Sequence, residues 1–152
     1  MKKFLAALVL ALAISSSCFA AGAVKNFTAE EKAADALIGA LTGNSVTYEV
    51  VSKNFSEGLK KNLTAEKFAE LKKQIKDQVG TVKEANFITY AKQYNPQTGY
   101  NNVEEMLYLG TVNKEKLARF VVLFAVENNV PKIVSFQVAP MEVNGQQPAE
   151  KK

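Results

Sequence analysis

Histidine is absent from all 152 residues, and cysteine occurs once, as Cys18. Without histidine the chain has no Ser-His or Cys-His catalytic pair, no ordinary proton shuttle near neutral pH and almost none of the patterns that bind zinc. A lone cysteine provides no disulfide framework, and glycine-rich phosphate loops are also missing. These absences argue against a hydrolase or a zinc enzyme, and we expect no metal and no cofactor.

The chain also lacks a large excess of positive or negative charge. The formal net charge is +4, and two of the lysines, Lys2 and Lys3, lie in the leader described below, so the mature chain carries 4 − 2 = +2. This value is too small to indicate nucleic-acid binding, and the lysine pairs have no interleaved aromatic residues. Apolar residues make up 47% of the chain and charged residues 22%, which is typical of a globular domain.

Residues 1–20 predict a secretory signal peptide. Lys2 and Lys3 form a positive start, residues 4–14 form an apolar run, and small residues precede a cut after Ala20. The run is shorter than the roughly 20 residues that cross a bilayer, so we expect no transmembrane span in the mature chain. The short, lysine-led leader favours a secreted protein, most simply in the bacterial periplasm.

Two other processing sites stay open. A cut after Ala23 is one alternative, and cleavage before Cys18 with lipidation of that cysteine is another. The serines at 15–17 make lipidation the less favoured reading, because a lipoprotein signal normally places a leucine or a similar residue three positions before the cysteine. If the cut follows Ala20, the mature chain has no cysteine at all.

Apolar residues recur at helical spacing in the first half of the mature chain. The first helix is expected over about 29–42, with a Thr28–Glu31 capping box and Gly43 as a left-handed terminator. Two shorter helical pieces are expected between 45 and 63, with Ser56 capping the second. A firmer helix is predicted from Thr64, its cap, to Gly80.

After residue 81 the pattern alternates, as in β-strands. The strand over 82–93 is predicted to place Ala85, Phe87, Thr89 and Ala91 on one face and Glu84, Asn86, Ile88 and Tyr90 on the other. Strands over 103–112, 117–126 and 133–140 follow, the last with Val134, Phe136 and Val138 on one face.

This order predicts an α+β fold in which N-terminal helices pack on a curved four-stranded antiparallel sheet. We expect one domain over 24–143 and a disordered tail over 144–152. The strand at 117–126 is apolar on both sides, so its second face needs a cover: a loop, the C-terminal segment, a second subunit or a ligand.

Several features carry a resemblance to a known fold. They are the first helix ending near Gly43, Asn54-Phe55-Ser56-Glu57-Gly58-Leu59-Lys60 before Leu63-Thr64-Ala65-Glu66, the glycine stop at Gly80, and the last strand from Lys132-Ile133-Val134 to Pro140. Residues 29–141 thereby resemble the cystatin-like cone of nuclear transport factor two, and in particular an uncharacterised family of short secreted bacterial domains. That family implies no established active site.

Enzymes with this fold, such as ketosteroid isomerases and polyketide cyclases, place an aspartate or histidine on the sheet. The only aspartates here, Asp35 and Asp77, are predicted on helices, so that template is not matched. The strand-borne carboxylates are Glu84, Glu104 and Glu105, any of which could act as a base in a pocket. The alternative is that they are edge charges that discourage aggregation.

Six residues are the candidates for binding. Arg119 is the one charge in an apolar strand, so it either holds an anionic ligand or reaches water. Tyr90, Tyr108 and Glu84 are ligand-binding candidates with it, while Tyr94 and Tyr100 bracket a turn and are candidates for contact with a partner.

The preferred function is a non-catalytic binding or interaction domain, secreted or periplasmic, for a small ligand or an envelope protein, with a homodimer through the sheet as a further option. The alternatives are a small isomerase or cyclase that uses a strand carboxylate, and an envelope lipoprotein with a structural role.

Overall fold

The computed structural model describes residues 26–43, 46–113 and 116–142. The predicted signal peptide, its three processing sites and the C-terminal tail lie outside these residues. The elements in chain order are α1 (Phe27–Thr42), α2 (Tyr48–Val51), the 3₁₀ turn η1 (Ser52–Asn54), α3 (Glu57–Asn62), α4 (Ala65–Gln78), β1 (Glu84–Asn95), β2 (Gly99–Thr111), β3 (Lys116–Glu127) and β4 (Val130–Glu142).

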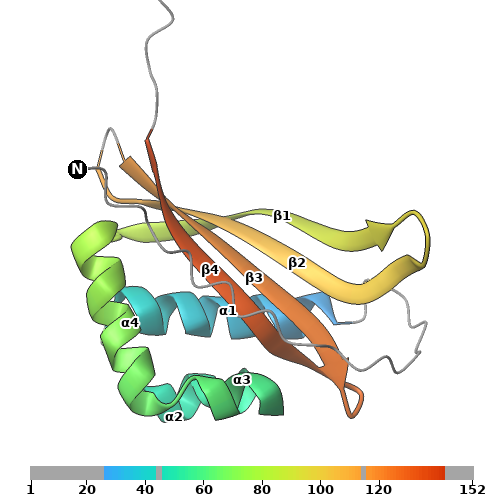
Figure 1. Ribbon diagram of the computed structural model, residues 1–152. Helices are drawn as coiled ribbons and strands as arrows, with labels where there is room; N and C mark the ends of the chain where they lie inside the picture. Colours follow the sequence, from blue (N-terminus) through green and yellow to red (C-terminus); the bar gives the residue numbers. More distant parts are fainter. Residues whose placement is uncertain (1–25, 44–45, 114–115, 143–152) are drawn as a thin grey trace, which may run out of the picture.

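The four strands form one antiparallel meander in the order β1-β2-β3-β4, and the helices that precede it lie together on one side (Figure 1). The predicted α+β fold, with N-terminal helices on a four-stranded antiparallel sheet, is therefore confirmed. No helix in the described part of the chain is long and apolar enough to cross a membrane.

Helices α3 and α4 begin at the residues predicted to cap them, and α4 ends before the predicted glycine stop. Ser56 Oγ accepts a hydrogen bond from the Leu59 N–H at 3.1 Å, and Thr64 Oγ1 accepts one from the Lys67 N–H at 3.4 Å. Gly80, after α4, has a φ of +101°, a backbone conformation that residues other than glycine rarely adopt. Both predicted caps and the glycine stop are confirmed.

The predicted end of α1 at residue 42 is confirmed, but its predicted start and the predicted conformation of Gly43 are wrong. The helix begins at Phe27, because the Asn26 carbonyl already accepts hydrogen bonds from two N–H groups of the first turn. Thr28 thus lies inside the helix, and the expected Thr28–Glu31 capping box does not form. Gly43 follows the helix in an extended conformation, with φ −126° and ψ −172°, and not in the left-handed one.

A β-bulge in β1 overturns the strict alternation predicted for that strand. Phe87 pairs with Tyr108, but the next pair joins Thr89 to Leu107, so Ile88 is an extra residue. Beyond it Tyr90 pairs with a core residue of β2, and the strand has changed phase. Tyr90 therefore shares the helix-covered face with Phe87, and not the face of Glu84.

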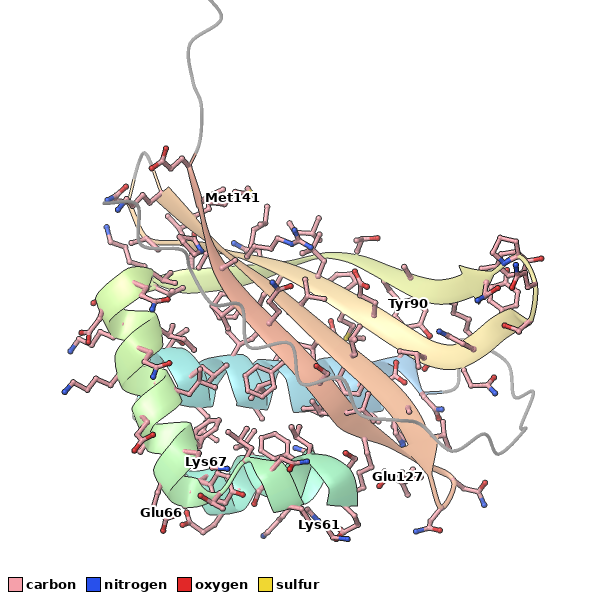
Figure 2. The ribbon with its side chains drawn as sticks, viewed as in Figure 1. Lys61, Glu66, Lys67, Tyr90, Glu127 and Met141 are labelled. Carbon is pink, nitrogen blue, oxygen red and sulfur yellow. The ribbon has the colours of Figure 1, made fainter. Side chains whose placement is uncertain are left out.

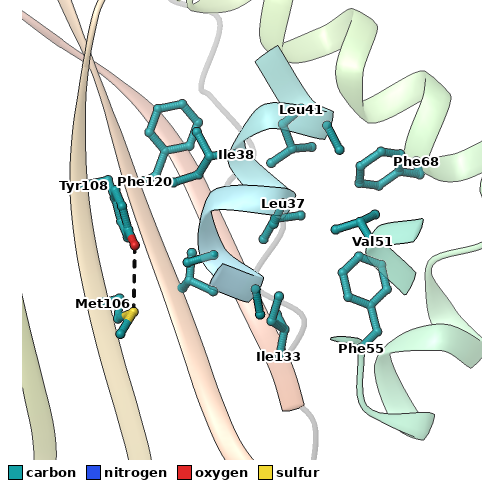
Figure 3. Packing of buried hydrophobic residues seen from close by; sticks show 14 of the residues in the cluster. Leu37, Ile38, Leu41, Val51, Phe55, Phe68, Met106, Tyr108, Phe120 and Ile133 are labelled. Carbon is teal, nitrogen blue, oxygen red and sulfur yellow. Dashed lines mark hydrogen bonds between the residues drawn. The ribbon is translucent and has the colours of Figure 1, made fainter. Parts of the chain in front are cut away.

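The core lies between α1 and the sheet. Figure 3 shows Ile38 of α1 beside Phe120 and Tyr108 of the strands. Leu37 and Leu41 lie on the other side of α1, toward Val51 and Phe68, and all belong to one buried cluster. Phe55 joins the short helices to the sheet, because it forms an isolated parallel bridge with Ile133 of β4. Burial of these large side chains is what fixes the helices to one face.

A second bulge changes the face assignment in β4. The register shifts between Leu123 and Phe124 of β3, so Ile133 joins the helix-side core together with Phe136 and Val138. Val134 is also buried, but outside that cluster. The prediction that Val134 shares a face with Phe136 and Val138 is therefore wrong.

Candidate functional site

Two glutamates from different elements meet beneath the first turn of α1. Glu30 is fully buried, and Glu104 of β2 is 8% exposed. Glu30 lies four and seven residues before Ala34 and Leu37, so it belongs to the apolar face of α1 that packs on the sheet. Sequence reasoning missed Glu30, although this spacing was the signal that could have found it.

Glu104 has two partners on the neighbouring strand β1. Lys92 Nζ lies 3.2 Å from Glu104 Oε1, and the two residues face each other across the strand pair. Tyr90 lies two residues before Lys92, on the same face of β1. Its hydroxyl (Figure 2) donates a hydrogen bond to the Glu104 carboxylate. Phe27 packs edge-on against the Tyr90 ring, with ring centroids 5.5 Å apart, and covers this cluster.

The two carboxyl groups hold one proton between them at neutral pH. Burial, then the hydrogen bond and negative charge of Glu104, raise the pKa of Glu30 to about 8. Burial alone would raise the pKa of Glu104, but hydrogen bonds from Glu30, Tyr90 and Lys92 outweigh it and lower that pKa. Glu30 is thus the acid and Glu104 its carboxylate acceptor.

This arrangement explains a feature that would otherwise be costly. Neither carboxyl oxygen of Glu30 receives a hydrogen bond from an N–H or O–H group in the described part of the protein. An ionised Glu30 would be a buried charge without a donor, whereas a protonated Glu30 is itself the donor. The same Glu104 charge, after burial, contributes to raising the pKa of Tyr90.

An acid beside its conjugate base can in principle transfer protons. Access to the pair is restricted, however. Neither of the two grooves described next is lined by Glu30, Glu104, Tyr90 or Lys92.

The first groove has a volume of about 290 Å³ and lies between α1 and the start of β1. Burial, then the charge and a hydrogen bond of Asp35, raise the pKa of Tyr108, whose hydroxyl also lies 4.0 Å from Met106 Sδ (Figure 3). The residues that line this groove are Asp35, Ile38, Gly39, Thr42, Val82, Lys83, Glu84, Ala85 and Tyr108.

The second groove, of about 230 Å³, lies between the short helices and α4. Two of its polar groups already have partners. The Tyr48 hydroxyl donates to the Leu63 carbonyl at 2.6 Å, and Lys72 Nζ donates to the Gly43 carbonyl at 2.8 Å. This hollow therefore offers mainly apolar surface.

The four residues predicted to bind a ligand lie in three separate places. Tyr90 is beside Glu104 under α1, while Tyr108 and Glu84 line the first groove. Arg119 is exposed on the other face of the sheet, between Leu109 and Ala139 of the adjacent strands. Tyr108 and Glu84 both border the first groove, but the register of the sheet places Glu84 on the face opposite to Tyr108, which is the face of Arg119.

The two tyrosines predicted to contact a partner do lie together. Tyr94 and Tyr100 pair across the end of the β1–β2 hairpin, and their ring centroids are 5.1 Å apart at an interplanar angle of 67°. The two residues are 61% and 64% exposed, and the hairpin end reaches beyond the first turn of α1 (Figure 1). Two large aromatic side chains thus stand in solvent at one point.

Among residues 26–43, 46–113 and 116–142, no three acidic or cysteine side chains are close enough together to hold a metal ion. Comparison with known proteins finds no protein-family model, no curated protein and no solved structure that matches this chain.

Proposed function

We propose that this protein is a non-catalytic binding domain that works outside the cytoplasm. The observation that carries the proposal is the exposed pair of Tyr94 and Tyr100 at the hairpin end. Single exposed apolar residues are common on protein surfaces, but adjacent tyrosines held in one geometry are typical of recognition surfaces. Their rings supply a large contact area at low cost in side-chain entropy.

The location outside the cytoplasm rests on the leader sequence. Membership of the secreted family that the chain resembles rests instead on the sequence features between Gly43 and Pro140. Mass spectrometry of the mature protein from cells tests it. A first residue of Ala21 or Val24 supports secretion, an acylated Cys18 supports the lipoprotein alternative, and an uncleaved Met1 contradicts both.

Binding is tested with the mature protein and separated envelope fractions: membranes, cell-wall material and soluble periplasmic protein. We expect co-sedimentation or co-purification with one fraction, and loss of it in the Tyr94→Ala/Tyr100→Ala double variant. Val130→Ala is the matched control, since Val130 is 48% exposed on the other hairpin. Equal retention of the double variant and the wild type would contradict the proposal.

A small ligand in the groove beside Tyr108 is compatible with the same function. Asp35 and Lys83 give that groove charges of both signs, and Thr42 adds a hydroxyl group. Thermal-shift measurements with small anions and envelope components test this part, with Asp35→Asn as the variant that should lose the response.

A second copy of the chain is the partner that fits the helix-free face of the sheet. Leu107 of β2 and Val121 of β3 pair at its centre, with Glu105 and Arg119 diagonally on either side. Two such faces can pack against each other around a two-fold axis that runs between the sheets and parallel to them, passing over the Leu107–Val121 pair. This symmetry places each Arg119 opposite Glu105 of the second copy.

The geometry and area of such a dimer are ordinary. With strands about 4.8 Å apart and a rise of about 3.4 Å per residue, the two sheets cross by roughly 40°, close in size to the about 30° of aligned sheet packing. A four-stranded face measures roughly 20 by 30 Å, comparable with the about 800 Å² that each partner contributes to a standard interface.

The alternative of a small isomerase or cyclase is favoured by one observation, the acid–base pair of Glu30 and Glu104 beside the Tyr90 hydroxyl. Exchange of carbonyl-activated C–H protons for deuterium, followed by NMR with small ketones, tests it without knowledge of the substrate. Exchange that is lost in Glu104→Gln and kept in Glu84→Gln would support the enzyme. No exchange above buffer would exclude this proton-abstraction chemistry.

A further inference from the structure

We propose that the hairpin end from Tyr94 to Asn102 binds an uncharged glycan chain. The inference rests on the proposed binding function and names the chemical class of its ligand. Three features of the hairpin end carry it: the absence of charge, the arrangement of the two tyrosine rings, and the narrowness of the surface.

No side chain from Tyr94 to Asn102 is charged, although charged residues make up 22% of the whole chain. The residues between the two tyrosines are Asn95, Pro96, Gln97, Thr98 and Gly99. The nearest cation along β1, Lys92, is already paired with Glu104. Anionic lipid surfaces and nucleic acids are bound through lysine and arginine, so this tip is not built for either.

The two tyrosines present flat apolar surface beside polar groups. Their rings meet edge to face, so the edge of one ring contacts the face of the other, and both residues stay largely exposed to solvent. A pyranose ring has the complementary form: C–H groups cover its faces, and hydroxyl groups surround its rim. Stacking of a sugar face on Tyr94 or Tyr100 leaves those hydroxyls free to reach the neighbouring amides.

The polar groups around the tyrosines are amides and a hydroxyl, which can both donate to and accept from sugar hydroxyls. The Asn95 Oδ1 atom accepts a hydrogen bond from the Gln97 N–H at 2.8 Å, and Asn101 Oδ1 accepts one from the Val103 N–H at 3.1 Å. These bonds hold two of the side chains in place before any ligand arrives. Preorganised polar groups lose little conformational entropy on binding.

The size of the tip favours a glycan over a folded protein. A stable protein interface takes about 800 Å² from each partner, whereas this end of a two-stranded ribbon is only about 5 Å from strand to strand. A protein partner would need surface beyond the hairpin end.

The test uses the complete mature protein and three kinds of probe: insoluble cellulose and chitin, the soluble oligosaccharides cellohexaose and chitohexaose, and polygalacturonate as an acidic polysaccharide. We expect one of the neutral probes to bind and to shift the NMR signals of Tyr94 and Tyr100. Raising the salt concentration should change that affinity less than about twofold, because no ion pair is involved.

Variants separate stacking from general effects on the fold. Tyr94→Ala and Tyr100→Ala should each weaken binding at least about fivefold, in line with the about 1–3 kcal/mol that stacking on an aromatic side chain provides for nucleic-acid bases. Tyr94→Phe keeps the ring face and should retain most of the affinity. Val130→Ala, on the β3–β4 hairpin, should leave the affinity unchanged. Circular dichroism checks that every variant is folded.

Absence of binding to all neutral probes would overturn the inference. Binding by Tyr94→Ala and Tyr100→Ala that is as tight as binding by the wild type would also overturn it. So would salt-sensitive binding to polygalacturonate alone. If these results came with loss of envelope-protein binding in the double tyrosine variant, the proposed binding function would stand and only its glycan ligand would be wrong. If the double variant kept all envelope binding, both would fail.

Discussion

Protonated Glu30 of α1 donates a hydrogen bond to the carboxylate of Glu104 of β2, so a buried carboxylic acid joins the first helix to the sheet. The pair is stable as one acid and one carboxylate. It holds the start of α1 by a charge-assisted hydrogen bond, and such bonds are about twice as strong as neutral ones.

This pair predicts a loss of stability as the pH rises. The pKa of Glu30 is about 8 in the folded protein and 4.5 ordinarily, so between these values the unfolded chain is ionised at Glu30 while the folded protein keeps the proton. The contribution of Glu30 to the free energy of unfolding should therefore be complete below about pH 4.5. It should decrease as the pH rises to about 8. The lowered pKa of Glu104 has the opposite sign: its contribution is lost as the pH falls below the ordinary 4.5.

Urea unfolding at intervals from pH 4 to 9 measures the profile, with a maximum expected near pH 5. Glu30→Gln keeps a donor for Glu104 but cannot ionise, so its profile should be flatter between pH 5 and 8. Glu70→Gln, an exposed change on α4, is the control and should follow the wild type. A Glu30→Gln profile that falls as steeply as the wild type would show that Glu30 does not carry the effect.

Lys92 and Lys60 form ion pairs in contrasting environments. Lys92 pairs with Glu104 at 3.2 Å with side-chain exposures of 29% and 11%, whereas Lys60 pairs with Glu57 at 2.8 Å with exposures of 36% and 74%. Lys92→Gln should lower the free energy of unfolding by about 1–3 kcal/mol, because the largely buried Glu104 carboxylate then loses its cationic partner. Lys60→Gln should cost about 0.5 kcal/mol or less. Equal losses in urea unfolding would contradict this difference.

Two glycines should respond to alanine with opposite sign. A Cβ at Gly110 of β2 would lie 2.6 Å from Val82 Cγ1 and 3.0 Å from Phe120 Cε2, so Gly110→Ala overpacks the core and should cost about 1–3 kcal/mol. A Cβ at Gly39 of α1 meets Val46 at 3.6 Å, an ordinary contact, and Gly39→Ala should stabilise the helix by about 0.5–1 kcal/mol. Thermal unfolding measures both, and a stabilising Gly110→Ala would contradict the packing described.

The sequence predicted the fold well where the signals were local. Ser56, Thr64 and Gly80 act through hydrogen bonds or backbone angles within a few residues, so their roles could be read from residue type and position. Hydrophobic spacing likewise located the helices and the four strands. The capping box at Thr28 failed because Asn26 starts the helix earlier.

The candidate sites were harder to predict, because they depend on contacts between distant segments. The bulge at Ile88 changes the phase of β1 and carries Tyr90 to the face of Glu104, which no alternating pattern reveals. Glu30 lies in the first turn of α1, and its burial depends on the sheet that packs against this helix. Tyr94 and Tyr100 could be paired from sequence because a short hairpin joins them.

The proposed two-fold dimer, in which Arg119 faces Glu105 of the second copy, predicts how self-association responds to charge. Arg119→Glu sets like charges against each other twice at the proposed interface, so the variant should be monomeric at concentrations where the wild type is a dimer. Glu105→Arg should have the same effect, and the Arg119→Glu/Glu105→Arg double variant should dimerise again. Light scattering after size exclusion measures the mass, and Lys132→Glu, a charge change outside the pair, is the control. A monomeric wild type, or a double variant that stays monomeric while both single variants dimerise, would contradict this packing, and the helix-free face would then need another cover.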